Sequence, residues 1–194
     1  MGPRPATLIA ALGTDAVIKR AVPGCAVEAG DWADIIAVAQ GVSVTLHPAN
    51  HWSARSLRDR RMALWCGFVI QVGSEVIYVA GDTGYGDGVI FRQVRERFGP
   101  PLVAVLPIGA YEPRWFMRNQ HVNPEEAVRI MLDCGARQAL GVHWGTFQLT
   151  DEDRVAPVVA LREACDQFGV PAERFPALEP GDVWISTLSA LRGN

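Results

Sequence analysis

The second half of the sequence alternates short apolar runs with amphipathic segments of helical spacing. Residues 90–98 are apolar at positions 90, 91, 94 and 98, which form one face of a helix, and Gly99-Pro100-Pro101 ends it. The same signals continue along the chain, with helices predicted at 123–134 and 156–168 and buried strands at 102–108 and 138–142. Strands and helices in this order are typical of an α/β fold with parallel strands.

The first half predicts mainly short strands. A strand at 6–12 and a helix at 15–22 come first, and the apolar runs 64–72 and 75–80 flank Gly73-Ser74, which favours a hairpin turn. Three β-rich pieces between them are expected to be antiparallel neighbours, and one more strand is expected near the end: Cys25–Glu28, Ile35–Ala39, Val42–Leu46 and Val183–Thr187. Because no repeat or linker interrupts this order, residues 1–194 are predicted to form a single domain.

Composition excludes several functional classes. The longest apolar runs span only a few residues, far below the roughly 20 that a membrane helix needs, so no integral membrane segment is predicted. A net charge of −3 and a single lysine supply no basic surface for a phosphate backbone, which argues against a nucleic-acid partner. The four cysteines are far apart and form no CxxC pair, which is typical of reduced thiols in a cytoplasmic protein.

Three polar residues, His51, Asp82 and His143, directly follow apolar runs that are predicted strands. Reactive groups collect at the carboxyl ends of strands in α/β sheets, and two imidazoles with a carboxylate suit a zinc-like ion. Each residue also has a plainer interpretation. A histidine after a strand is commonly a surface or hydrogen-bonded residue, and an aspartate in Gly-Asp-Thr-Gly commonly forms a turn. The spacing alone therefore leaves a metal site as one hypothesis.

Aromatic residues gather near the same strand ends. Trp52, Tyr111 and Trp115 lie in or beside predicted loops, as does Phe147 in the block His143-Trp144-Gly145-Thr146-Phe147. Large rings commonly form the rim of a core. The alternative is a hydrophobic binding mouth, which contiguous rings at loop positions favour.

Five blocks in order carry a resemblance to a known family. They are Pro48-Ala49-Asn50-His51-Trp52, Ala80-Gly81-Asp82-Thr83-Gly84-Tyr85, the stretch from Pro107 to Met117 (PIGAYEPRWFM), the stretch from Gln120 to Ala127 (QHVNPEEA), and His143-Trp144-Gly145-Thr146-Phe147. Together they resemble the metallo-β-lactamase superfamily, in the branch that contains the N-acylphosphatidylethanolamine-hydrolysing phospholipase D enzymes. The resemblance implies a metallo-β-lactamase-like αβ/βα sandwich and a metal-dependent phosphodiesterase acting on N-acyl phospholipids or related diesters.

The resemblance also implies roles for single residues. The residue matching His51 binds the first of two zinc ions, the one matching Asp82 bridges them as part of the catalytic centre, and the one matching His143 completes the second site. His121 matches an active-site histidine near the substrate phosphate or leaving group, with Gln120 as a polar neighbour, and the substrate-facing aromatic residues are Trp52, Tyr111 and Trp115. The sequence alone leaves another role for His121, which is to dock the turn before the helix cap at Asn123.

One motif of the family is absent from the sequence. His-x-His-x-Asp-His supplies four ligands in the family, whereas the four histidines of this chain stand at 47, 51, 121 and 143, and His47 matches no ligand. The chain therefore resembles the C-terminal portion of the fold, incomplete at the N-terminus. We expect two zinc ions in a complete parent enzyme but one or none in this chain, which should be inactive or weakly active.

Missing strands should also leave a sheet edge uncovered, which favours a homo-oligomer that covers the open sheet. For the parent enzyme we expect a small-molecule or lipid substrate and leave peripheral contact with a membrane open. The alternative function is a non-catalytic binding module or a self-associating remnant of the fold.

Overall fold

The computed structural model describes residues 7–54, 56 and 58–186. Its largest element is a six-stranded sheet in the order β3-β4-β5-β6-β7-β8. The strands β3 (Ile35–Ala39), β4 (Val42–His47), β5 (Gly67–Val72) and β6 (Glu75–Val79) are antiparallel, and β7 (Val103–Pro107) and β8 (Gln138–Val142) continue from β6 in parallel. This α/β architecture confirms the predicted fold class.

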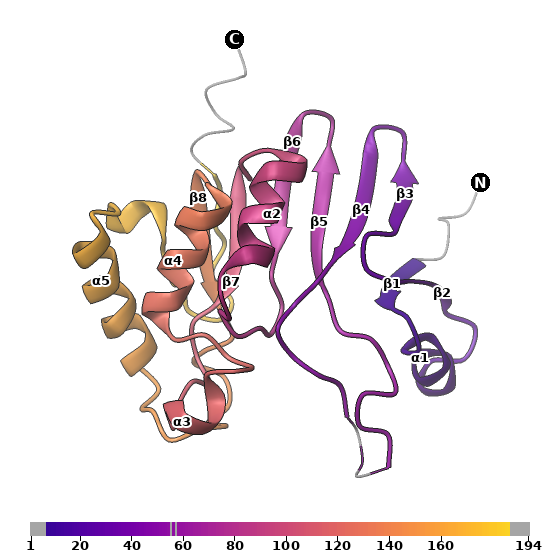
Figure 1. Ribbon diagram of the computed structural model, residues 1–194, viewed down its shortest axis with the longest axis horizontal. Helices are drawn as coiled ribbons and strands as arrows, with labels where there is room; N and C mark the ends of the chain where they lie inside the picture. Colours follow the sequence, from indigo (N-terminus) through magenta and orange to yellow (C-terminus); the bar gives the residue numbers. More distant parts are fainter. Residues whose placement is uncertain (1–6, 55, 57, 187–194) are drawn as a thin grey trace.

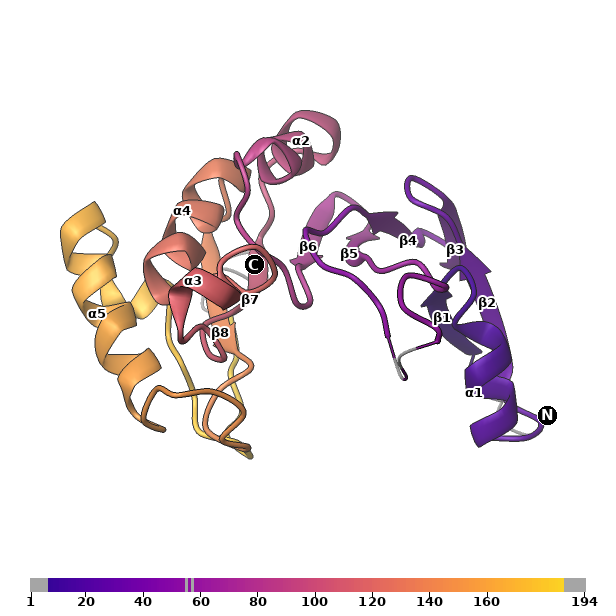
Figure 2. The same cartoon turned by 60° about the horizontal axis from the view of Figure 1, so that its bottom comes forward.

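Helices cover one face of the parallel half of the sheet (Figures 1 and 2). They are α2 (Val89–Phe98), α4 (Pro124–Cys134) and α5 (Ala156–Phe168), with α4 packed between the other two. The core lies beneath them and includes the fully buried side chains of Tyr78, Leu106 and Ile130. Helix α4 begins where the sequence predicts it, because the side chain of Asn123 accepts a hydrogen bond from the Glu126 amide and completes a capping box.

Strand direction places the ligand candidates at one edge of the sheet. Strand β4 runs antiparallel to β5 and β5 antiparallel to β6, so β4 points the same way as β6, β7 and β8. The segments that follow these four strands therefore emerge at the same edge, which lies at the lower side of Figure 1. His51 follows β4, Asp82 follows β6 and His143 follows β8.

The remaining elements are small. Strands β1 (Thr7–Ala11) and β2 (Ala26–Gly30) form a separate two-stranded sheet joined by α1 (Asp15–Ala21), at the end of the molecule opposite to α5 (Figure 2). Helix α3 (Arg114–Met117) lies between β7 and α4 in the chain, and a short 3₁₀ helix spans Ala172–Arg174. Among the described residues, no helix combines the length and the apolar character needed to cross a membrane.

One predicted strand pairing and one predicted strand are wrong. The strand predicted at Cys25–Glu28 corresponds to β2, but β2 pairs with β1 in parallel rather than antiparallel to its neighbours. Helix α1 separates the two strands, and such a crossover returns the chain in the same direction. Residues 183–186 are not a strand, and Val183 and Ile185 are 85% and 77% exposed, so this segment has no sheet partner to bury it. Thr187 lies outside the described residues.

The edge strand β3 presents apolar side chains to solvent. Ile35 is 61% exposed and Val38 is 55% exposed, and within the described part of the chain β3 is hydrogen-bonded to β4 alone. An exposed apolar edge strand is a surface on which another chain can pair. A homo-oligomer in which a second copy of the chain covers this edge stays a prediction.

Candidate metal centre

Three residues that are far apart in the sequence converge at the end of the sheet where β4, β6, β7 and β8 have their carboxyl ends. His51, Asp82 and His121 each offer one ligand atom, and these atoms all lie within 4.8 Å of one another. His51 belongs to the loop after β4, Asp82 directly follows the β6 segment, and His121 follows α3. Two of the predicted ligands are thus in one group, together with the residue that the resemblance places near the substrate phosphate.

The orientation of His51 leaves one ring nitrogen free for a ligand. Its Nδ1 atom lies 2.7 Å from the carbonyl oxygen of Trp52, so an Nδ1–H group donates to that carbonyl and the lone pair resides on Nε2. The Nε2 atom lies 3.4 Å from Nε2 of His121, and the two rings are perpendicular. A second bond that fixes the tautomer in this way is common in metal-binding histidines.

His121 is half-buried, and burial lowers its pKa to about 4, which the nearby Asp82 carboxylate offsets only in part. Its imidazole is therefore neutral at pH 7 and carries a lone pair on one nitrogen. Its Nδ1 atom is buried and has no hydrogen-bond partner among the described residues. A neutral imidazole that faces His51 through Nε2 and lies near the Asp82 carboxylate fits a cation.

His143 lies beside this group rather than in it. Its Nε2 atom is 3.4 Å from Oδ1 of Asp82, and its ring stacks on that of His121 at 5.6 Å between centroids. The backbone of His143 has a φ of 63°, a left-handed conformation that is uncommon for residues other than glycine. Gly109 permits this arrangement, because a Cβ atom there would collide with the backbone carbonyl of His143.

The donor set suits one ion. His51, Asp82 and His121 supply two imidazole nitrogens and a carboxylate oxygen, which are the ligand types of catalytic zinc sites. The Asp82 side chain is 43% exposed, so solvent or a substrate can reach the same point. Three protein ligands leave a position open for substrate, whereas a pair of ions requires more ligands than this cluster offers.

The predicted substrate-facing residues take different positions. Trp52 stacks on His51 and is covered on its ring by Arg60, whose guanidinium carbon lies 4.4 Å from the ring centroid. Tyr111 is buried, whereas Trp115 is 79% exposed on α3. Gln120 is half-buried directly before His121.

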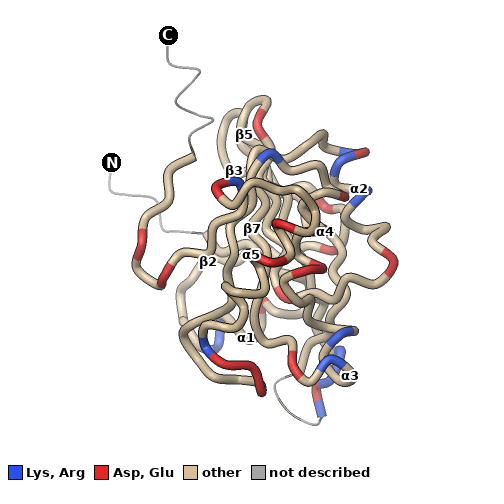
Figure 3. The backbone as a smooth tube through the Cα atoms, turned by 90° about the vertical axis from the view of Figure 1, so that its left-hand side faces the viewer, with Lys and Arg blue, Asp and Glu red and all other residues tan. Residues whose placement is uncertain are grey.

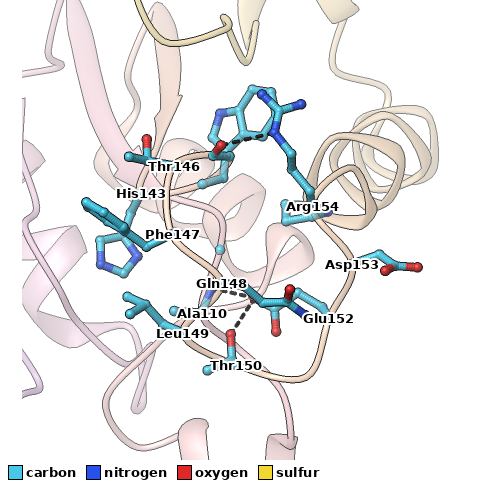
Figure 4. A pocket seen from close by; sticks show the side chains of 14 residues that line it. Ala110, His143, Thr146, Phe147, Gln148, Leu149, Thr150, Glu152, Asp153 and Arg154 are labelled. Atoms are coloured by element: carbon cyan, nitrogen blue, oxygen red, sulfur yellow. Dashed lines mark hydrogen bonds between the residues drawn. The ribbon is translucent and has the colours of Figure 1, made fainter.

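A cavity of about 210 Å³ opens beside His143 (Figure 4). Its wall combines apolar and polar side chains, and Trp52, Tyr111, Trp115 and Gln120 are not among the residues that form it. The wall includes Ala110, His143, Trp144, Phe147, Leu149 and Glu152. A partly apolar cavity thus lies next to the candidate metal centre, and most of its lining comes from the segment after β8.

Glu152 is a structural residue of the site that the sequence analysis missed. Its carboxylate accepts hydrogen bonds from the backbone N–H groups of Ala110 and Glu112, at 2.6 and 3.0 Å, and from the Thr150 hydroxyl at 2.8 Å. Burial raises the pKa of Glu152, but these hydrogen bonds outweigh it and hold the pKa below its usual value. Glu152 thereby fixes the loop that leads from β7 to α3.

Arg114 fixes the other end of that loop. Its guanidinium donates to the backbone carbonyl of His121 at 2.8 Å and to the Glu126 carboxylate at 2.7 Å. Glu126 also belongs to the capping box of α4, so Arg114 connects the His121 backbone to the start of that helix. The only sequence signal for Arg114 was its place in the PRWFM block of the family resemblance.

Comparison with known proteins assigns the family. The family described as "Beta-lactamase superfamily domain" matches residues 2–144. The chain belongs to this family. The match confirms the superfamily resemblance that the sequence blocks carried.

Two relatives confirm the branch. The chain is 35% identical over 157 residues to N-acyl-phosphatidylethanolamine-hydrolyzing phospholipase D 1 of Caenorhabditis elegans, a match covering 80% of the chain and 44% of that protein. It is 45% identical over 128 residues to the mitochondrial N-acyl-phosphatidylethanolamine-hydrolyzing phospholipase D of Saccharomyces cerevisiae, covering 65% of the chain and 27% of that protein. The chain thus spans less than half the length of these relatives.

Solved structures support the same fold. The isothiocyanate hydrolase from Delia radicum gut bacteria has a TM-score of 0.68 at 18% identity, covering 95% of this chain and 69% of that one. The metallo-hydrolase Igni18 from Ignicoccus hospitalis has a TM-score of 0.65 at 19% identity, covering 90% of this chain and 66% of that one. At this level of identity, the likeness concerns the fold alone.

Proposed function

We propose that this chain carries part of the active site of a zinc-dependent phosphodiesterase that acts on N-acyl phospholipids or related diesters. The observation that carries the proposal is the cluster of His51, Asp82 and His121 at the carboxyl edge of the sheet. The names of the two phospholipase D relatives support the substrate class. The partly apolar cavity beside His143 supports a substrate with a hydrophobic portion.

In the proposed centre of this chain, His51, Asp82 and His121 hold one ion. His143, which contacts Asp82, is proposed to join His51 and Asp82 as a metal ligand in a longer protein that holds two ions, as the family resemblance implies. Zinc supplies Lewis acidity toward a phosphoryl oxygen when it is bound. Asp82 contributes the negative charge that makes the site selective for a cation, and its contact with His143 orients that ring. In that longer protein His121 is proposed to face the substrate phosphate, as the resemblance implies, where its neutral imidazole can accept a proton.

The chain by itself is proposed to be inactive or weakly active, because the described cluster supplies ligands for one ion only. A second candidate function is a non-catalytic, self-associating module. The exposed apolar residues Ile35 and Val38 on the edge strand β3 favour this candidate.

Contact with a lipid surface is also proposed, and exposed aromatic side chains support it. Trp115 and Phe116 on α3 are 79% and 58% exposed, and Phe147 at the cavity is 79% exposed. Figure 3 shows basic positions around α3, which are arginines because the single lysine, Lys19, lies in α1, and these arginines can face anionic headgroups. Rings with arginines at one surface are typical of proteins that bind the membrane interface.

Metal titration and hydrolysis together test the function. We expect calorimetric titration of the purified chain with ZnCl₂ to show at most one site, which His51→Ala and Asp82→Ala remove. Arg118→Gln, at an exposed position of the same loop region, is the control and should bind zinc normally. A chain that takes up no zinc at millimolar concentration contradicts the metal centre.

A hydrolysis assay tests whether the chain by itself is inactive or weakly active. We expect the zinc-loaded chain to hydrolyse bis(4-nitrophenyl) phosphate and N-acyl phosphatidylethanolamine at no more than trace rates. Rapid hydrolysis that His51→Ala abolishes would show that the chain is a complete enzyme. A longer protein that adds a His-x-His-x-Asp-His segment is expected to bind two zinc ions and to lose zinc in Asp82→Ala.

A further inference from the structure

The three segments that carry the clustered ligands meet again at a single buried residue, Thr83. Asp82 is its neighbour in the chain. Asn50, the residue before His51, donates its backbone N–H to the Thr83 hydroxyl at 2.9 Å. Val122, the residue after His121, donates its backbone N–H to the Thr83 carbonyl at 2.9 Å.

Thr83 is fully buried, and its hydroxyl uses both hydrogen-bonding functions. The oxygen accepts the Asn50 N–H, and the hydroxyl hydrogen is donated to the carbonyl of Gly84 at 2.9 Å. Gly84 and Asn50 are also joined directly, because the Gly84 N–H donates to the Asn50 carbonyl at 2.8 Å. The hydroxyl thus closes a small network between the His51 loop and the Asp82 loop.

The chemistry of the network makes the hydroxyl hard to replace. Removing the buried Thr83 hydroxyl leaves the backbone N–H of the half-buried Asn50 without its acceptor, which costs free energy. We therefore expect Asn50 to shift toward another acceptor or solvent. Any movement of Asn50 is passed to His51, the next residue, whose Nε2 atom must stay within a few ångströms of Asp82 and His121. The Thr83 carbonyl is part of the main chain, so the link to Val122 survives substitution of the side chain.

We propose that Thr83 is a positioning residue of the candidate metal centre, whose hydroxyl holds the His51 loop against Asp82. The proposal rests on the proposed function insofar as the cluster binds a metal. Substitution of a residue that orients metal ligands without contacting the metal typically lowers metal affinity by about 10- to 100-fold.

The variants isolate the hydroxyl. Thr83→Val keeps the shape of the side chain and removes the acceptor, whereas Thr83→Ser keeps the hydroxyl and removes a methyl group. The matched control is Thr45→Val in β4, because Thr45 is also buried and its hydroxyl has no hydrogen-bond partner among the described residues. Thr83→Ala serves in place of Thr83→Val if the valine variant does not fold.

Two measurements are made on every variant. The first is zinc affinity by calorimetry, which we expect to fall about tenfold or more in Thr83→Val and to recover in Thr83→Ser. The second is hydrogen exchange of single backbone amides in the metal-free chain. The Asn50 amide should lose protection in Thr83→Val, whereas the Val122 amide should keep it, and Thr45→Val should alter neither amide nor the zinc affinity.

The outcomes separate this proposal from the proposed function. Unchanged zinc affinity in Thr83→Val, with zinc binding by the unaltered chain intact, overturns the positioning role and leaves the metal centre standing. A chain that binds no zinc overturns the metal centre instead. In that case the positioning role is decided by exchange alone, and equal protection of Asn50 in Thr83→Val and Thr83→Ser contradicts it.

Discussion

The Nε2 atoms of His51 and His121 lie 3.4 Å apart although 70 positions separate the two residues in the chain. Because Nδ1 of His51 is bonded to a backbone carbonyl, its lone pair on Nε2 points at the other imidazole. Two neutral imidazoles share at most one hydrogen bond at this contact, and a cation between them and Asp82 would use both lone pairs. The geometry of this pair is the strongest single indication of a metal centre.

Substitution of each histidine in turn should identify the ligands. We expect His51→Ala to abolish zinc binding, because its Nε2 faces both other members of the cluster. His121→Ala should also weaken zinc binding, because the ligand atoms of His51, Asp82 and His121 lie close together. His143→Ala tests whether His143 is a metal ligand, as the family resemblance implies, and a loss of zinc binding in this variant would support that role. Calorimetry with ZnCl₂ measures all three variants.

The control for this series is His47→Gln. His47 is buried in β4, and its Nε2 atom bonds to the carbonyl oxygen of Ile90, which a glutamine amide can replace. Zinc affinity should therefore be unchanged in His47→Gln. A loss equal to that of His51→Ala would contradict the assignment of His47 as a residue that binds no metal.

Glu152 should contribute stability that disappears in acid. Its pKa in the folded chain lies below the usual value of 4.5, so folding favours the ionised form. The contribution is complete above about pH 4.5 and is lost as the pH falls through the lower pKa of the folded state. Glu152→Gln should lower the free energy of unfolding by about 1–2 kcal/mol at pH 7, because glutamine has one acceptor oxygen: one of the Ala110 and Glu112 N–H groups loses its acceptor, and the other hydrogen bond loses its charge.

Urea unfolding of Glu152→Gln and the unaltered chain, measured between pH 3 and pH 7, checks this prediction. The difference between the two curves should shrink toward acid pH. Asp153→Asn, at the neighbouring exposed acid, is the control. A constant difference across the pH range would show that the carboxylate charge is not what holds the loop.

The sequence predicted the site residues that follow strands and missed those that act through tertiary contacts. His51, Asp82 and His143 stand directly after apolar runs, and parallel strand direction brings such ends together. His121 precedes a helix cap instead, and only the family resemblance indicated a role for it. Thr83 and Glu152 bond to backbone groups up to 42 positions away, and no local pattern encodes such partners.

The error in β2 has a different origin. An apolar alternation predicts that a segment is a strand but carries no information about the direction of its partner. The sequence predicts a helix at 15–22, and a helix between two strands favours a parallel crossover. The sequence thus carries a signal for the parallel pairing, but the β-rich pieces that follow favour antiparallel neighbours.

Gly84 should be intolerant of any side chain. A Cβ atom there would lie 2.6 Å from the backbone carbonyl atoms of Asn119, so either Gly84 or the 118–119 segment must shift. That segment leads directly to His121, and the shift should lower zinc affinity along with stability. Gly84→Ala is compared with Gly41→Ala by calorimetry and thermal unfolding.

Gly41 is the control because nothing lies within 4 Å of the position that a Cβ atom would take. Its φ of 72° makes alanine strained, so Gly41→Ala should lose stability without losing zinc affinity. Equal zinc affinity in both variants would contradict the link between Gly84 and the His121 segment.

Arg114 should resist replacement even by lysine. The guanidinium bonds at once to the carbonyl of His121 and to Glu126, and a single ammonium group reproduces this pair of contacts poorly. We expect Arg114→Lys to lower the free energy of unfolding by about 1–2 kcal/mol. Urea unfolding with Arg118→Lys as control checks the value, and equal midpoints would show that the two contacts are dispensable.

The exposed edge of the sheet makes a prediction about association. Ile35 and Val38 on β3 are more than half exposed, and the backbone of an edge strand has unpaired groups on its outer side. If this edge pairs with a second copy, the mass measured by light scattering should exceed that of one chain, 21.1 kDa, and rise with concentration. Val38→Lys should restore the single-chain mass, because a charged residue on an edge strand opposes pairing. Val183→Lys, at a position that is 85% exposed outside any sheet, should leave the association intact. A single-chain mass for the unaltered protein at all concentrations would contradict self-association through β3.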